Sequence, residues 1–290
     1  MNFKIRHILT PVDFSETSLK ALEHAIFMAK VFEAKLSLIH VLEVLNYANE
    51  MNIPLIDNEL SSVIRKRLDD LADSIHLNHG IIKPQVILNS GNIAETIVNT
   101  AEDIEADIIL MGTHGASGWK EFLIGSNAYK VVTKASCPVL TIQKNGTKPS
   151  YRNIVLPIDD TVSSRQKVKN AVEFAQHYGS IIHVLGLITV DEPEVHSKFD
   201  VRLNQVNKYL DKHGVPWKNK IIVGDNIAKM TMNYAKEINA DLIMIMTEQE
   251  ENLTGFILGP YAQQVINHSS IPVLSVTPQE IFITEMVHPY

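Results

Sequence analysis

Four glycines lie within residues 111–126 (MGTHGASGWKEFLIGS), between an apolar run and a helix-like segment. Gly112 and Gly115 directly follow the apolar run, whereas Gly125 and Ser126 open the helical segment, which gives the spacing G-x2-G-x9-G-S. Glycine permits a close approach of the backbone, and a helix N-terminus presents unpaired N–H groups with a partial positive charge. Together these features can hold a phosphate group.

Polar side chains near these glycines add to this chemistry. Ser126 and Asn127 can donate hydrogen bonds to phosphate oxygens, and His114 and Lys120 can supply positive charge. Neither common phosphate signature, G-x-x-x-x-G-K-[ST] or G-x-G-x-x-G, is present in the sequence. An irregular loop with Ser126 as a helix cap would explain any single glycine, but the complete spacing favours a ligand.

The first half of the chain alternates short apolar runs with amphipathic segments. The runs at 8–12, 36–41, 85–88, 108–111 and 139–142 are typical of buried strands, and helices are predicted around 19–29, at 58–78, after Asn92 and from Ser126. This order predicts a parallel sheet covered by helices on both faces. Ligands bind such sheets at the carboxyl ends of the strands, where the strand order reverses. Asp13 and the glycine segment both follow strands.

The second half of the chain repeats the first. The segment ILTPVD at 8–13 matches IVLPID at 154–159, and ADIILMGTHG at 106–115 matches ADLIMIMTEQ at 240–249. We also align His40 with His183 and expect them to share a structural role. The repeat predicts two tandem domains, 1–145 and 151–278, joined by a polar linker. A C-terminal tail, 279–290, is apolar enough to pack on a neighbouring domain or subunit.

Three segments carry a resemblance to a known family: TPVDFSETSLKAL at 10–22, MGTHGASGWKEFLIGSNAYKVV at 111–132 and CPVL at 137–140. They resemble the nucleotide-binding branch of the universal stress protein family, and the resemblance covers nearly the whole chain as two copies. It implies an α/β fold with two tandem Rossmann-like domains of the adenine nucleotide alpha hydrolase-like type. Each domain would hold a five-stranded parallel sheet in the order 3-2-1-4-5, with helices on both faces.

Family members with the glycine motif bind ATP, and the resemblance assigns the binding residues. Asp13 and the backbone of Val41 would contact the adenine, and Pro11 and Val12 would line its pocket. The residues around the ribose and phosphates would be Met111, Gly112, His114, Gly115, Gly125, Ser126 and Asn127. A Mg²⁺ ion would be carried by the phosphates, so we predict no protein residues that ligate a metal.

The second copy has lost most of the glycine motif. At a constant offset of 134 residues, the counterparts of Gly112, Gly115, Gly125 and Ser126 are Met246, Gln249, Gly259 and Pro260. Proline suits the first position of a helix but has no N–H group, and the nearby glutamates would repel a triphosphate. We therefore expect no ATP binding of this kind in the second domain. Gly112, Gly115 and Ser126, which the second copy lacks, are then better explained by a ligand than by the scaffold.

The composition excludes several classes of partner. The chain carries 26 Lys and Arg against 33 Asp and Glu, a net charge of −7, which argues against nucleic-acid and anionic-membrane binding. No apolar run approaches the roughly 18 residues that span a bilayer. Cys137 is the single cysteine, which favours a cytoplasmic location. We predict that it is a small core residue rather than a nucleophile.

The predicted function is a nucleotide-dependent regulatory module in the stress response, acting through an unidentified protein partner. His114 and Lys120 are the local candidates to assist hydrolysis, and nothing in the sequence orients them. We therefore expect at most a weak ATPase. Two alternatives stay open: a slow ATP-hydrolysing or nucleotidyl-transferring enzyme, and a nucleotide-free dimeric scaffold. The resemblance implies that the last strands pair across a two-fold axis, as a homodimer or as a pseudo-dimer within the chain.

Overall fold

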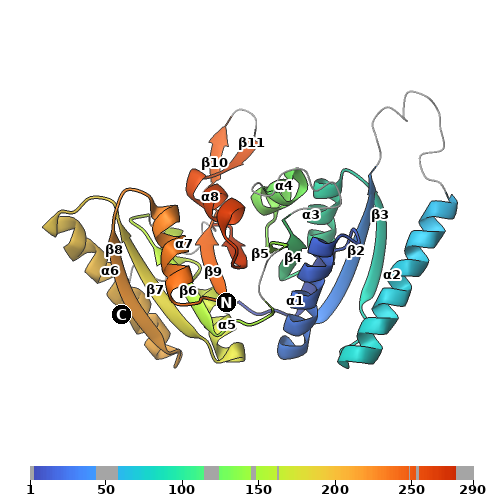
Figure 1. Ribbon diagram of the computed structural model, residues 1–290, viewed down its shortest axis with the longest axis horizontal. Helices are drawn as coiled ribbons and strands as arrows, with labels where there is room; N and C mark the ends of the chain where they lie inside the picture. The colour runs from blue at the N-terminus through green and yellow to red at the C-terminus, as the bar shows by residue number, and fades with distance from the viewer. Residues whose placement is uncertain are drawn as a thin grey trace. The chain divides into compact units, whose positions relative to one another are not determined.

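The chain forms two compact α/β units, seen here in a computed structural model (Figure 1). The structure describes residues 3–43, 58–113, 124–144, 148–161, 163–247, 249–252 and 255–278. One unit, the first domain, comprises Ile5–Lys144, and the other, the second domain, comprises Asn145–Tyr290 together with Met1–Lys4. Within the described residues, no helix is both long and apolar enough to cross a membrane.

The first domain alternates strands and helices in the order that the apolar pattern predicts. Its strands are β1 (His7–Pro11), β2 (Lys35–Glu43), β3 (Gln85–Gly91), β4 (Ile108–Gly112) and β5 (Val139–Ile142), and its helices are α1 (Glu16–Phe32), α2 (Asn58–His79), α3 (Ile93–Asp103) and α4 (Ser126–Lys134). The strands pair in parallel in the order β3-β2-β1-β4-β5. This confirms the predicted order 3-2-1-4-5. The chain builds the sheet outward in opposite directions from β1 and β4, so the switch point lies between these two strands.

The second domain repeats this topology. Its strands β6 (Asn153–Ile158), β7 (Ile181–Ile188), β8 (Trp217–Val223), β9 (Leu242–Met246) and β12 (Val273–Val276) pair in parallel in the order β8-β7-β6-β9-β12. Its helices are α5 (Val168–Tyr178), α6 (Pro193–Lys212), α7 (Ile227–Glu237) and α8 (Pro260–His268). An antiparallel ribbon, β10 (Gln249–Asn252) with β11 (Gly255–Leu258), stands where the first copy has its glycine segment. The sequence did not predict this ribbon.

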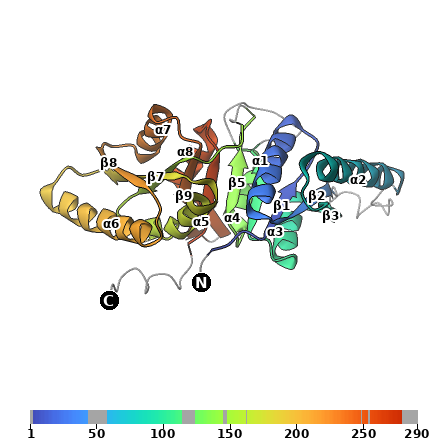
Figure 2. The same cartoon turned by 90° about the horizontal axis from the view of Figure 1, so that it is seen from below.

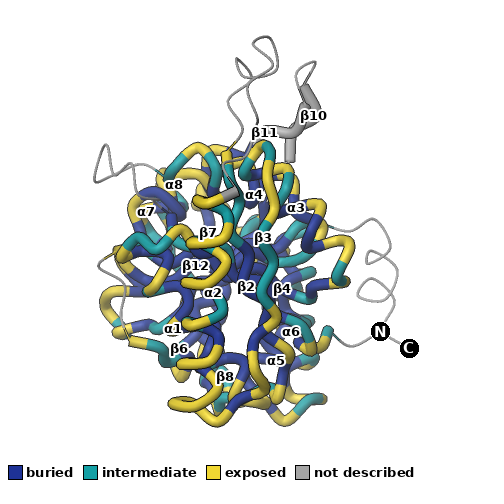
Figure 3. Tube along the Cα trace, turned by 90° about the vertical axis from the view of Figure 1, so that its right-hand side faces the viewer, coloured by how far each residue is buried: buried dark blue, intermediate teal, exposed yellow. Residues whose placement is uncertain are grey.

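Helices cover both faces of each sheet, as the continuous apolar strands require. In the first domain α1 and α2 lie on one face and α3 and α4 on the other, and in the second domain α5 and α6 lie opposite α7 and α8 (Figure 2). Buried residues concentrate on the strands, where Leu9, Ile108, Ile154 and Leu242 are fully buried (Figure 3). Covering both faces of a parallel sheet gives the apolar core from which the strand ends project.

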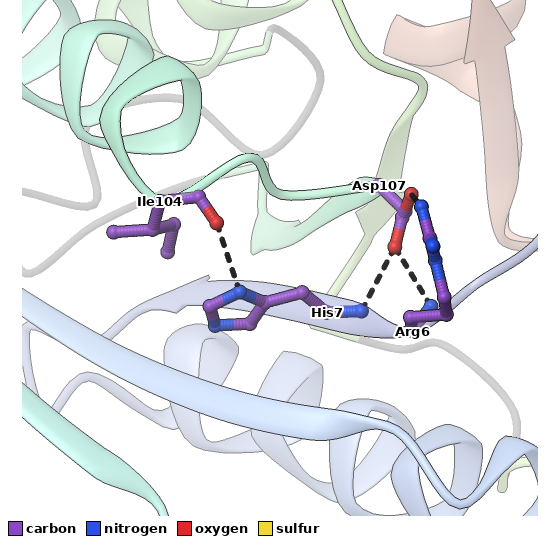
Figure 4. A network of polar contacts seen from close by, with 4 residues as sticks. All are labelled: Arg6, His7, Ile104 and Asp107. Atoms are coloured by element: carbon purple, nitrogen blue, oxygen red, sulfur yellow. Dashed lines mark hydrogen bonds and ion pairs between the residues drawn. The ribbon is translucent and has the colours of Figure 1, made fainter.

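An aspartate joins the amino ends of the first and fourth strands in the first domain. The Asp107 carboxylate accepts hydrogen bonds from the backbone N–H groups of Arg6 (2.7 Å) and His7 (2.9 Å), as Figure 4 shows. The His7 ring adds a hydrogen bond from Nδ1 to the carbonyl of Ile104 (3.0 Å). We call this arrangement the aspartate clamp. It fixes β1 against the start of β4, far along the strands from their carboxyl ends.

The second domain contains the same two backbone hydrogen bonds of the aspartate clamp, without the histidine. Asp241 accepts hydrogen bonds from the backbone N–H groups of Arg152 (3.0 Å) and Asn153 (2.8 Å). These residues precede β9 and begin β6, which are the counterparts of β4 and β1. The two domains therefore keep one solution for holding the amino ends of their central strands.

The strand register corrects the alignment of His40 with His183. His183 and Ser37 pair with equivalent residues of the first strands, Val155 and Leu9, so His183 is the counterpart of Ser37. The counterpart of His40 is Gly186. The alignment was wrong because both copies contain the triplet HVL, at 40–42 and at 183–185, which lies three residues out of structural register.

With the corrected register, each domain has a histidine in the link between its first two strands, on the first strand in one domain and on the second strand in the other. In the first domain His7 Nε2, on β1, lies 2.8 Å from Ser37 Oγ on β2. In the second domain His183 Nε2, on β7, lies 3.3 Å from Asn153 Oδ1 on β6. Both pairs link the first two strands through buried or half-buried polar side chains, so these histidines have a structural role.

Candidate functional site

A cavity of about 150 Å³ lies at the carboxyl ends of β1, β2 and β4 in the first domain, beside the starts of α1, α3 and α4. It brings together the two polar segments that the sequence places after strands. The predicted site residues that line it are Pro11, Val12, Asp13, Val41, Met111, Gly112, Gly125, Ser126 and Asn127. The other two predicted residues, His114 and Gly115, lie outside the described residues, as does Lys120.

The cavity wall also contains residues that the sequence reasoning missed. They are Ser18, Ile39, His40, Ile93, Ile97, Thr113 and Ala128. Ile93 and Ile97 stand one turn apart at the start of α3, so the helical period could have placed both on the face toward the strand ends. His40 could have been found from its place next to Val41.

The first residues of α4, Ser126, Asn127 and Ala128, line this cavity, and the first-turn amides of a helix have no partner within the helix. Gly125 precedes the helix, and its N–H donates to the carbonyl of Thr113 at 2.6 Å, which ties the helix start to the end of β4. Among the described residues no side chain caps α4, whereas Ser15 caps α1 and Asn92 caps α3. An uncapped helix start beside a cavity suits an anion, because the amides and the helix dipole both favour negative charge.

Asp13 lies in the turn between β1 and α1. Its carboxylate accepts a hydrogen bond from the backbone N–H of Ser15 (3.0 Å), and its own N–H donates to Ser18 Oγ (3.4 Å). Asp13 is exposed, so its carboxylate can also accept hydrogen bonds from a molecule in the cavity. Such a molecule would need donor groups at this end.

His40 lies at the same end of the cavity with a defined ring orientation. Its Nδ1 is 2.6 Å from the carbonyl oxygen of Val12. Because a carbonyl oxygen can only accept, Nδ1 carries the proton, and Nε2 of the neutral ring is then an acceptor. Asp13 and His40 therefore both give this end of the cavity an acceptor character.

Gly112 has a packing role in addition to its place in the cavity wall. A Cβ atom on Gly112 would lie 2.8 Å from Thr17 Cγ2 and 2.9 Å from the Thr17 backbone carbonyl carbon. The first turn of α1 therefore packs directly on the bare backbone at the end of β4. The scaffold gives Gly112 a reason of its own, so a ligand is not needed to explain this glycine, contrary to the sequence-based interpretation.

In the second domain, bulkier residues stand at two of the corresponding positions, and they are buried. Met246, the counterpart of Gly112, is buried, and a 3-10 turn (Ser163–Arg165) replaces the first helical turn, so that α5 begins only at Val168. Thr231 and Tyr261, the counterparts of Ile97 and Asn127, are buried with their hydroxyl oxygens 3.2 Å apart.

Cys137 and His76, outside the cavity, have structural explanations. Cys137 is half-buried rather than a core residue, and burial raises the pKa of its thiol to about 12, which keeps the thiol protonated. His76 donates from Nδ1 to the carbonyl of Ile81 (2.7 Å). Within the described ranges, no group of three or more His, Cys, Asp or Glu side chains is arranged to hold a metal ion.

Together, the fold and the cavity define a tandem pair of parallel α/β domains with a cavity at the switch point of the first. A family model described as the universal stress protein family matches residues 4–143 and 150–277. These two matches span most of the chain. The chain belongs to the universal stress protein family.

Curated relatives match one domain's length of this chain. The universal stress protein MJ0531 of Methanocaldococcus jannaschii is 33% identical over 146 residues, which cover 48% of this chain and 82% of the relative. The universal stress protein YxiE of Bacillus subtilis is 32% identical over 146 residues, which cover 47% of this chain and 97% of the relative. Each covers about half of this chain, as expected for a tandem protein.

A solved structure matches the whole chain. The universal stress protein from Archaeoglobus fulgidus aligns with a TM-score of 0.75 at 22% identity and covers 93% of this chain and 98% of its own. At this identity the match shows the fold, which is two tandem domains of the universal stress protein type.

Proposed function

We propose that the first domain binds an adenine nucleotide, ATP with Mg²⁺, and that the chain is a nucleotide-dependent regulatory module in the stress response. The observation that carries this proposal is the cavity of about 150 Å³ that gathers nine predicted residues beside the uncapped start of α4. Asp13 and His40 provide acceptors at one end of the cavity. At the other end are the start of α4 and the side chains of Ser126, a hydroxyl, and Asn127, an amide.

Each end of the cavity suits one end of the nucleotide. Asp13 can accept from the exocyclic amine of adenine, and Val12, Val41 and Met111 provide an apolar wall for the ring. Ser126 and Asn127, with the first-turn amides of α4, can hold phosphate oxygens. None of the described lining residues is a lysine or an arginine, so Mg²⁺ carried by the phosphates would offset much of their charge.

We also propose that the second domain does not bind ATP in this mode. Met246 occupies the position of Gly112, and Pro260 at the start of α8 removes the N–H and the hydroxyl that Ser126 offers. Thr231 and Tyr261, at the positions of the cavity residues Ile97 and Asn127, are buried with their hydroxyl oxygens 3.2 Å apart, so a bulky tyrosine stands where the first domain has Asn127. One nucleotide per chain is therefore the expected stoichiometry.

Isothermal titration of the full-length protein with Mg-ATP tests both statements. We expect binding near one equivalent per chain, and a higher melting temperature in the presence of the ligand, because it binds only the folded protein. The variant Asn127→Tyr copies the second domain and should abolish binding, whereas Tyr261→Phe should leave it unchanged. Two equivalents per chain would contradict the asymmetry, and no binding would contradict the proposal.

The absence of fast hydrolysis is a separate part of the proposal. We expect phosphate release from the bound ATP close to the background rate, as for a binding module. Sustained release in a stoichiometric complex, lost in Asn127→Tyr, would instead favour the enzyme alternative.

The assembly and boundaries of the chain stay predictions. We propose a homodimer or a pseudo-dimer of the two domains, and light scattering of the eluted protein would give the mass that separates these states. We propose domain limits of 1–145 and 151–278 with a tail at 279–290, which limited proteolysis would test at the linker. A regulatory protein partner and a cytoplasmic location are proposed from the sequence alone.

A further inference from the structure

Phe14 has an unusual backbone conformation at the edge of the site. Its φ is +61°, and the other described non-glycine residues with positive φ, Glu33, Glu105 and Asn239, all lie just after helices. A left-handed residue after a helix is common, but a bulky aromatic residue in this region before a helix is an outlier. Such strain persists where the surroundings impose it, and it occurs most often at functional sites.

Two side chains hold the Phe14 ring. Arg67, on α2, places its Cζ 3.9 Å from the centroid of the ring. The His40 ring lies 5.7 Å away, centroid to centroid, at an interplanar angle of 36°. We call Arg67, Phe14 and His40 the aromatic stack. It runs from the exposed side of α2 to the cavity wall, and it includes the residue next to Asp13.

At the positions of Phe14 and His40, which the structure describes in both copies, the second domain differs. Asp160 takes the place of Phe14 and is not among the described residues with positive φ. Gly186 takes the place of His40, and Leu203 from α6 packs against it, since a Cβ there would lie 3.2 Å from Leu203 Cδ1. The aromatic stack therefore occurs in the domain with the cavity, whereas the second domain lacks a ring at both of these positions.

We propose that Phe14 and Arg67 are positioning residues that hold Asp13 and His40 at the base end of the cavity, and that the aromatic stack thereby sets a preference for adenine over guanine. The inference rests on the proposed nucleotide binding. Asp13 offers a carboxylate acceptor, and His40, with Nδ1 committed to Val12, offers Nε2 as an acceptor. Adenine presents an amine donor at its six-position, whereas guanine presents a carbonyl at that position and would have to turn in the cavity to offer its N1–H and 2-amino donors to Asp13.

The variant Phe14→Gly removes the aromatic ring but keeps the backbone turn, because glycine adopts a positive φ without strain. The turn and the start of α1 should persist, so the melting temperature of the unliganded protein reports on the fold. We expect the affinity for ATP to fall about tenfold, the equivalent of one ordinary hydrogen bond, and the affinity for GTP to change little. Titration calorimetry of the full-length protein with each Mg-nucleotide gives the ratio of the two affinities.

Arg67→Met tests the outer member of the stack. It keeps the length of the side chain but removes the cation, and we expect the ratio of ATP to GTP affinity to fall about threefold. The double variant Phe14→Gly with Arg67→Met should equal Phe14→Gly alone, since Arg67 acts through the ring. Arg202→Met is the matched control, because Arg202 lies 5.6 Å from the Phe199 ring in the second domain, and its ratio should not change.

The outcomes separate this inference from the proposed function. An unchanged ATP to GTP ratio in Phe14→Gly, or an equal loss for both nucleotides, overturns the inference while ATP binding by the wild-type protein upholds the proposed function. A wild-type protein that binds neither nucleotide overturns both. A lower ratio in Phe14→Gly and Arg67→Met, with Arg202→Met unchanged, supports the stack as the origin of the preference.

Discussion

The two domains agree at the amino ends of their central strands and differ at the carboxyl ends. Asp107 and Asp241 make the same clamp, with two backbone hydrogen bonds each. At the carboxyl ends, Gly112 of the first domain aligns with Met246 of the second. The first domain has a cavity there, whereas Met246, Thr231 and Tyr261 are buried at the aligned positions of the second. The amino ends of the strands thus carry what the fold needs, and the carboxyl ends are where the copies diverge in chemistry.

The pair Gly112 and Met246 shows how one position can serve both fold and site. In the first domain the missing Cβ lets the first turn of α1 pack at the end of β4. In the second domain a methionine stands there, and the helix begins six positions later in the aligned sequence, after a 3-10 turn. The glycine therefore supports a helix start that carries Asp13 and Ser18 to the cavity, rather than only clearing space for a ligand.

The substitution Gly112→Met should have the largest effect on this comparison. Its Cβ would lie within 3.0 Å of the Thr17 backbone, so either the first turn of α1 moves or the strand end does. We expect the free energy of unfolding to fall by about 2–3 kcal/mol, as for other overpacked cores. Urea unfolding followed by circular dichroism measures it, with the volume-conserving Met246→Leu as a control. Wild-type stability in Gly112→Met would show that α1 can start late without cost, as α5 does.

Ser126→Pro should have the next largest effect, and on binding rather than on folding. The change copies Pro260, which begins α8, so helix α4 should persist. It removes one N–H and one hydroxyl from the proposed phosphate site, and hydrogen bonds to a charged group are each worth about 1.5–3 kcal/mol. We expect an affinity for Mg-ATP about 10–100-fold lower, with little change in melting temperature.

The reverse substitution sharpens the same point. Pro260→Ser should not create a nucleotide site in the second domain, because Met246 and Tyr261, both buried, still stand at the positions of Gly112 and Asn127. If Pro260→Ser raised the stoichiometry to two nucleotides per chain, the loss of the motif serine alone would explain the difference between the domains.

Local patterns in the sequence predicted the strands and helices, whereas the family resemblance supplied the strand order and the assignment of the cavity residues. Continuous apolar runs mark parallel strands, and the three- and four-residue steps mark helices, so the order 3-2-1-4-5 followed once the family resemblance supplied the topology. The start of α8 at Pro260 was also predictable, since proline is favoured at the first helical position.

Features that depend on packing between distant segments were not predictable. The positive φ of Phe14 accompanies a ring contact with Arg67 on α2, and the late start of α5 accompanies a methionine at the end of the fourth strand. The equivalence of His183 with Ser37 needed the strand register, because a shared triplet suggested another alignment. The packing role of Gly112 needed the distance to Thr17, which no spacing in the sequence contains.

Removing the aspartate clamp should have a moderate effect that is equal in the two domains. Asp107→Ala and Asp241→Ala each leave two backbone N–H groups without their acceptor, and we expect each to lower the free energy of unfolding by about 1–3 kcal/mol. Neither should change the affinity for Mg-ATP, because the clamp lies at the opposite end of the strands. A loss of affinity in Asp107→Ala without a loss of stability would show that the two ends of the sheet are coupled.

The smallest expected effect is a dependence of stability on pH that comes from His7 and His183. Burial is the main cause that lowers the pKa of both below the ordinary value of 6.5, and the charge of Lys218 adds to the effect at His183. At pH values just below 6.5, these histidines therefore bind protons in the unfolded chain while both rings stay mainly neutral in the folded protein. Stability should be complete above the unfolded pKa of 6.5 and decline as the pH falls below it.

Urea unfolding at several pH values between about 7.5 and 5.5 measures this decline. His7→Asn places in the first domain the residue that the second domain has at that position, and it should remove the contribution of His7 to the slope. His183→Ser is the matched change in the second domain, since serine stands at its counterpart. If the double variant kept the full slope, other groups would be responsible, and the exchanged histidines would contribute nothing to the pH dependence. If each single variant instead removed its own part of the slope, each domain would contribute one neutral imidazole to the pH dependence. That imidazole, half-buried at His7 and buried at His183, links the first two strands of its domain near the amino ends that both copies share.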